Sequence, residues 1–81
     1  MAIYGYIASP AQSGGPSPLS EVTFQFSTAD LRQIAKFISY CADEIEAGRF
    51  TDGGRHLRDN DRHWQKNNAL SDVIVTPLSA T

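Results

Sequence analysis

The residues best suited to chemistry gather in one short stretch, HLRDNDRHWQ, at positions 56–65. If this stretch were helical, His56, Asp59 and His63 would share one face, because their spacings of three and seven match helical turns. Two imidazoles and one carboxylate can ligate a transition metal. A histidine oriented by an aspartate can instead act as a general base in acyl or phosphoryl chemistry. The stretch therefore has three interpretations: a metal site, a catalytic base or a structural tether.

The rest of the sequence favours the tether. The histidines belong to no HExxH motif, and the single cysteine, Cys41, excludes a paired CxxC. A catalytic base would need a nucleophile, but no serine lies in a Gly-x-Ser-x-Gly turn. Leu57 and Trp64 are the largest apolar groups in a long connection, so we expect them to anchor it in the core. We therefore predict a protein without enzymatic activity, cofactor or metal.

Hydrophobic alternation predicts three strands around these residues. Residues 3–8 (IYGYIA) are apolar or aromatic on both faces, which suits a strand with neighbours on each side. Residues 21–26 (EVTFQF) alternate as in a half-buried strand, and residues 72–77 (DVIVTP) predict a last strand. The proline-rich and glycine-rich residues 9–18 predict a long connection.

A helix is predicted between the second and third strands, where the hydrophobic period changes to 3.6. Ser27 or Thr28 can cap its start, and Gly48 suits the left-handed position after its end. The predicted buried stripe consists of Leu31, Ile34, Ile38, Cys41 and Ile45, with Ala35 and Ala42 beside it. Cys41 is thus expected in the core.

The element order β-β-α-β predicts the fold class. Because crossover connections are right-handed, the third strand should lie beside the first, which gives the spatial order 2-1-3. We therefore expect a single α+β domain over residues 1–81, with a three-stranded antiparallel sheet and one long amphipathic helix on one face. The other face would leave Tyr4 and Tyr6 exposed, and this favours a homodimer.

The composition indicates which classes of partner and which cellular compartment to expect. The net charge of −2 argues against a nucleic-acid partner, which usually meets a concentrated basic face. No apolar run approaches the length of a membrane helix, and the first residues do not resemble a signal peptide. The single cysteine agrees with a reducing compartment. We expect a cytoplasmic protein without a membrane partner.

Short motifs along residues 1–77 resemble a family of small bacterial immunity proteins of polymorphic toxin systems. The matching residues are EVT at 21–23, Ser27 with Leu31, His56, Leu57 and Asp59 of HLxD, Trp64, and Asp72 with Ile74 and Val75. The insertion at residues 9–18 departs from the family pattern. Members are inferred to bind and neutralise a cognate toxin, so the resemblance implies a protein-binding module without catalysis.

The charge distribution suggests where a toxin would bind. Residues 21–52 contain six acidic and three basic side chains. If the toxin is a nuclease, its cleft must attract phosphate and will be basic, so the acidic end of the helix should dock there. The candidate partner-binding residues are Asp43, Glu44, Glu46 and Asp52. The alternative function is a small regulatory or structural homodimer without a toxin partner.

Overall fold

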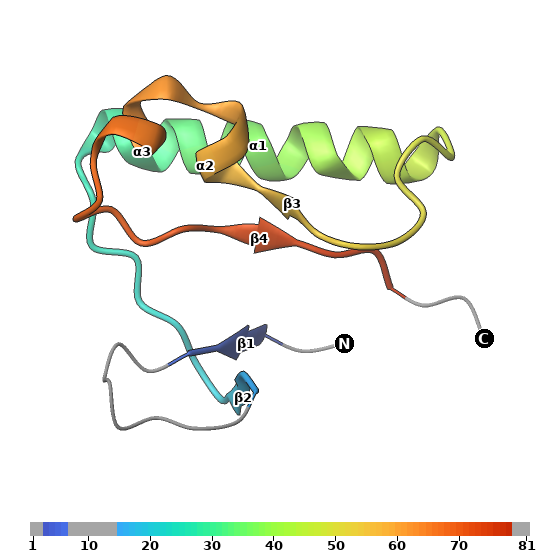
Figure 1. Ribbon diagram of the computed structural model, residues 1–81, viewed down its shortest axis with the longest axis horizontal. Coiled ribbons are helices and arrows are strands. Elements are labelled where there is room, and N and C mark those ends of the chain that lie inside the picture. Colours follow the sequence, from blue (N-terminus) through green and yellow to red (C-terminus); the bar gives the residue numbers. More distant parts are fainter. Residues whose placement is uncertain (1–2, 7–14, 79–81) are drawn as a thin grey trace.

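The structure is a computed structural model that describes residues 3–6 and 15–78. It is a small α+β fold with a long helix and short antiparallel strands (Figure 1). The elements are β1 (Ile3–Gly5), β2 (Ser17–Leu19), α1 (Thr28–Glu46), β3 (Arg55–His56), α2 (Leu57–Asn60), α3 (Arg62–Lys66) and β4 (Ile74–Val75). β1 pairs with β2, and β3 pairs with β4, which makes two separate two-stranded sheets.

Both ends of α1 are set by local chemistry. Ser27 is the N-cap, and its hydroxyl oxygen accepts a hydrogen bond of 3.1 Å from the amide of Asp30. Gly48 adopts a φ of 77°, and the amide of Arg49 then donates to the carbonyl of Glu44 at 2.9 Å. This is the Schellman arrangement, which only a left-handed residue permits without strain. The helix ends predicted from the sequence are therefore confirmed.

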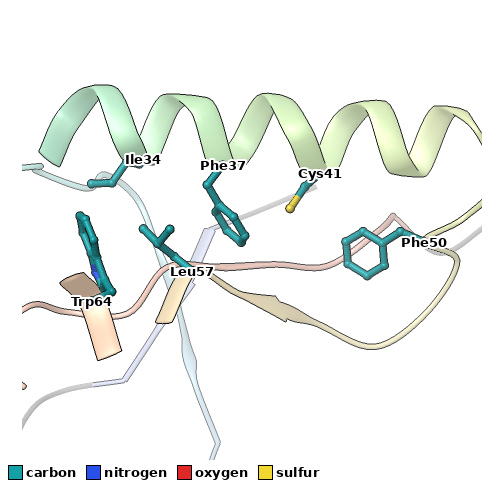
Figure 2. Close-up of a cluster of buried hydrophobic side chains, with 6 residues drawn as sticks. All are labelled: Ile34, Phe37, Cys41, Phe50, Leu57 and Trp64. Carbon is teal, nitrogen blue, oxygen red and sulfur yellow. The ribbon is translucent and has the colours of Figure 1, made fainter. Parts of the chain in front are cut away.

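The core lies between α1 and the segment that follows it (Figure 2). Its buried side chains are Ile34, Phe37, Cys41, Phe50, Leu57 and Trp64. The predicted apolar stripe of α1 is wrong at two positions, because Leu31 and Ile38 are 40% and 43% exposed. Leu57 and Trp64 pack on the side of α1 that carries Phe37, so the buried face is rotated away from the stripe chosen from the sequence.

The predicted three-stranded sheet with order 2-1-3 is also wrong. β4 pairs with β3, in the register Arg55↔Val75 and His56↔Ile74, and it makes no ladder with β1. A two-residue strand is too short to show alternation, so β3 left no periodic signal in the sequence. β3 comes directly before the core residue Leu57. It therefore pairs with the edge of β4 that the right-handed crossover rule had assigned to the first strand.

The second strand lies elsewhere than predicted. β2 spans Ser17–Leu19 and overlaps the end of the predicted connection at residues 9–18, whereas residues 21–26 form no strand. Phe26 is half-buried with its ring centroid 6.0 Å from that of Trp64, but Phe24 on the same face is largely exposed. The alternation in 21–26 therefore belongs to an extended lead into α1. Residues 7–8 of the predicted first strand and 9–14 of the predicted connection lie outside the described residues.

Candidate functional site

The HLRDNDRHWQ stretch folds into α2 and α3, which cover the core against α1. Leu57 and Trp64 are both fully buried, at 0% exposure. The indole Nε1 of Trp64 donates a hydrogen bond of 3.0 Å to the carbonyl of Ser71, and the guanidinium of Arg58 donates to the carbonyl of Leu70. Side chains from the stretch thus hold the chain that leads into β4.

His56 contributes to the same connection. Its Nδ1 lies 2.7 Å from Oδ2 of Asp72, while Oδ1 of Asp72 accepts hydrogen bonds of 2.9 Å from the amides of Arg58 and Val73. Burial alone would raise the pKa of Asp72, but the hydrogen bonds from Arg58, His56 and Val73 together place that pKa below its ordinary value. An ionised Asp72 therefore joins the start of α2 to the residues before β4.

The three residues proposed to share a helical face are separated in the structure. The helical path is interrupted at Asp61, whose backbone is extended with a φ of −140°. His63 lies beyond this break and pairs with Asp30 of α1, with 3.3 Å between Nε2 and Oδ1. Asp59 is exposed. Within residues 3–6 and 15–78, no cluster of three or more His, Cys, Asp or Glu side chains could hold a metal ion.

Both carboxylates that contact the histidines come from outside the stretch. The structure places Asp72 beside His56 and Asp30 beside His63, whereas the sequence had suggested Asp59 as the neighbouring carboxylate. Asp72 had a signal available, because it stands with Ile74 and Val75 in the DxIV motif of the sequence.

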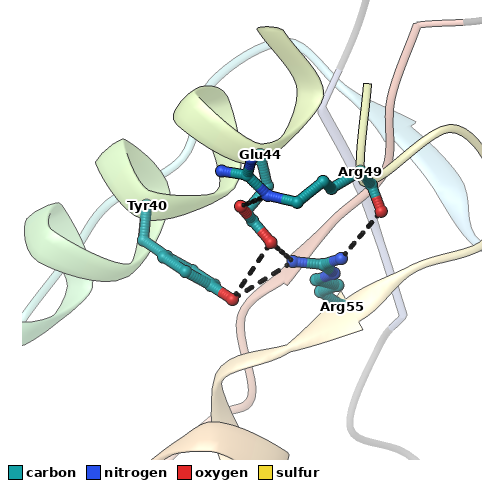
Figure 3. A network of polar contacts seen from close by, with 4 residues as sticks. All are labelled: Tyr40, Glu44, Arg49 and Arg55. Atoms are coloured by element: carbon teal, nitrogen blue, oxygen red, sulfur yellow. Dashed lines mark hydrogen bonds and ion pairs between the residues drawn. The ribbon is translucent and has the colours of Figure 1, made fainter. Parts of the chain in front are cut away.

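Glu44 is engaged within the protein (Figure 3). Its carboxylate lies 2.5 Å from Nε of Arg49 and 3.1 Å from Nη1 of Arg55, and the hydroxyl of Tyr40 donates to it at 3.4 Å. The guanidinium of Arg55 also lies over the ring of Phe50, 4.4 Å from its centroid. The hydrogen bonds from Arg49 and then Arg55 lower the pKa of Glu44. Glu44, which was predicted to bind a partner, is thus part of an internal network of ion pairs and hydrogen bonds that joins α1 to β3.

The other three predicted partner-binding carboxylates are placed differently. Asp43, Glu46 and Asp52 are exposed, and none of them takes part in an ion pair in the part of the chain that the structure describes. Asp43 and Glu46 are three residues apart on α1, so they project from neighbouring turns on the same side. They can therefore meet a partner without giving up an internal contact.

An apolar stripe runs along α1 up to these carboxylates. It consists of Leu31, Ala35, Ile38 and Ala42, all exposed, and we call it the α1 stripe. The spacing of four, three and four residues places them on one face, and Glu46 follows Ala42 one turn later. The sequence predicted Leu31 and Ile38 to be buried, with Ala35 and Ala42 beside the buried stripe. In the structure all four side chains are instead exposed to solvent, next to acidic side chains.

In the comparisons with known proteins, no family model, curated protein or solved structure matches the chain. No helix in the described residues is long and apolar enough to cross a membrane. A function is therefore inferred from the motifs named above and from the surface of α1.

Proposed function

We propose that this protein is an immunity protein, a non-catalytic module that neutralises a cognate bacterial toxin by direct binding. The observation that carries this proposal is the exposed α1 stripe, which ends beside the free carboxylates of Asp43 and Glu46. The motif resemblance supplies the kind of partner. Such a module needs no cofactor, metal, nucleic acid or membrane, and we place it in the cytoplasm, where a toxin could reach the cell's own targets.

The α1 stripe fits a known mode of recognition. Its positions correspond to i, i+4, i+7 and i+11, and amphipathic helices use such spacings to lie in an apolar groove of a partner. Leu31 and Ile38 would supply the anchors, since both retain a substantial exposed area. Covering the half-exposed side chain of each would contribute about 1 kcal/mol to binding. The stripe would therefore contribute a modest binding affinity through apolar burial, which is not specific to one partner.

The carboxylates would provide orientation and speed. A nuclease toxin has a basic cleft, and the potential of Asp43, Glu46 and Asp52 would attract it. Glu44 would contribute less, because Arg49 and Arg55 already compensate its charge. We therefore expect the three free carboxylates to affect mainly the association rate, with an effect that fades at high salt.

Co-expression with the product of the adjacent reading frame tests the proposal. We expect rescue from toxicity and a complex that co-purifies. Ile38→Lys should weaken binding by at least about tenfold, and Glu46→Lys should slow association at low salt. Asp59→Lys is the matched control, because Asp59 is an exposed carboxylate outside α1. If the two proteins remain folded but fail to co-purify at low salt, the immunity function is wrong.

The alternative function is a small regulatory or structural homodimer without a toxin partner. The exposure of Tyr4 and Tyr6, at 61% and 69%, favours self-association. The neighbouring gene distinguishes the two functions. A toxin encoded beside this protein supports the immunity function, whereas a homodimer without a toxin partner requires no such gene.

A further inference from the structure

The free charges on α1 form two blocks of opposite sign. Of the charged side chains of α1, Asp30 and Glu44 are used in ion pairs with other elements. The others are exposed and take part in no ion pair within residues 3–6 and 15–78; they are Arg32, Lys36, Asp43 and Glu46. A basic block thus precedes an acidic block along the helix.

This arrangement is unfavourable for the helix by itself. Arg32 and Lys36 are four residues apart, so two like charges lie on neighbouring turns and repel each other. The same holds for Asp43 and Glu46, which are three residues apart. Glu46 is also the last residue of α1, where the helix dipole is negative, and the last turn contains no basic side chain. Opposite charges from outside the domain would compensate both blocks.

The two blocks are complementary to each other about the middle of α1. Arg32 and Glu46 lie seven residues before and after Ser39. Lys36 and Asp43 lie three residues before and four residues after it. A two-fold axis near Ser39 that relates two antiparallel copies of α1 therefore brings Arg32 of each copy to Glu46 of the other. The same axis brings Lys36 to Asp43, and each of these contacts occurs twice.

The α1 stripe supplies the apolar part of this contact. Its spacing of four, three and four residues is that of the apolar seam between two paired helices. Ile38 would lie against Ala42 of the second copy, where the small side chain lets the helices approach closely. Helical geometry places the free charges along one flank of the stripe and the buried Ile34 and Cys41 along the other. An apolar seam and a row of charges can therefore be covered together.

We infer that two copies of this chain form a homodimer in which their α1 helices pair antiparallel. A second copy is favoured over a basic cleft, because such a cleft would compensate only the acidic block and would repel Arg32 and Lys36. The seam from Leu31 to Ala42 is only about 17 Å long, so the dimer is of the weak, micromolar class. This inference goes beyond toxin binding, because the dimer forms without a toxin.

Sedimentation equilibrium of the purified chain without a toxin tests the inference. At tens to hundreds of micromolar we expect a monomer–dimer equilibrium that shifts toward monomer as salt is added. Glu46→Arg should raise the dimer dissociation constant at least about tenfold, because both symmetric contacts change from attraction to repulsion. Adding Arg32→Glu to this variant should return the constant to within about threefold of the wild-type value, since the exchanged charges are again complementary.

Asp59→Arg is the matched control. It reverses an exposed carboxylate outside α1 and should leave the dimer dissociation constant unchanged. Unfolding is not expected to mimic the effect of Glu46→Arg, because a basic side chain at the end of α1 favours the helix, and circular dichroism checks this.

Three results would overturn the inference. They are a wild-type protein that stays monomeric throughout this range, a dimer that Glu46→Arg leaves intact, and a double variant that dimerises no better than Glu46→Arg alone. Toxin binding is measured separately. A monomer that binds its toxin refutes the dimer alone, and a dimer that fails to co-purify with a toxin refutes the immunity function alone.

Discussion

Replacing Trp64 tests whether the HLRDNDRHWQ stretch holds the fold together. Its side chain is fully buried, packs near Phe26, and donates an indole hydrogen bond to the carbonyl of Ser71. Trp64→Ala should lower the free energy of unfolding by about 3–5 kcal/mol, the range for large buried aromatics. A domain of this length has roughly 4–12 kcal/mol in total. The variant should therefore be close to unfolding at room temperature.

A second variant at the same position separates packing from hydrogen bonding. Trp64→Phe keeps most of the apolar volume but leaves the carbonyl of Ser71 without its donor, which should cost about 1–3 kcal/mol. His63→Ala is the control. The imidazole is 58% exposed and its ion pair with Asp30 is open to solvent, so its loss should cost less than about 1 kcal/mol.

Urea unfolding followed by far-ultraviolet circular dichroism measures all three variants, because Trp64 is the only tryptophan and fluorescence would lose its reporter. The expected ranking of destabilisation is Trp64→Ala, then Trp64→Phe, then His63→Ala. If His63→Ala costs more than Trp64→Phe, the stretch acts through its imidazole and the tether interpretation is wrong.

Further predictions concern the pH dependence, the thiol and the helix end. The pKa of Asp72 is lowered on folding, so its contribution to stability is complete above its ordinary pKa of 3.8 and is lost as the pH falls through the lower folded value; Asp72→Asn should flatten this acid loss in urea titrations. Burial raises the pKa of the Cys41 thiol, Arg55 lowers it and Glu44 raises it, so native protein should react with a thiol reagent far more slowly than urea-unfolded protein. Gly48→Ala should cost about 1–2 kcal/mol in thermal or urea unfolding, because alanine is strained at a φ of 77°.

The sequence predicted α1 well because its signals are local. A hydroxyl cap and a left-handed glycine determine where the helix begins and ends, and both act within one turn. The rotation of its buried face was not predictable in the same way. Ile34 and Cys41 belong equally to a stripe with Ile38 and to a stripe with Phe37, and only the position of the packing partners decides between them.

The strands were harder to predict because their pairing is not local. Residues 21–26 alternate as a strand should, yet they find no partner in the described structure. β3 has two residues and no periodic signal, but it lies next to the core residue Leu57 and captures β4. Hydrophobic alternation indicates that a segment could form a strand with one buried face. Which strands pair depends on which strand edges the packing of the core brings together.

The motif residues and the proposed contact surface have different roles in this structure. Leu57, Trp64 and the pair of His56 with Asp72 hold the segment before β4 against the core. These motif residues therefore serve the fold, and one fold can carry many functions. Under the proposed immunity function, recognition of a particular toxin should then depend on residues outside the motif. The α1 stripe and the nearby carboxylates satisfy this condition, so substitutions there should change the partner while the motif preserves the domain.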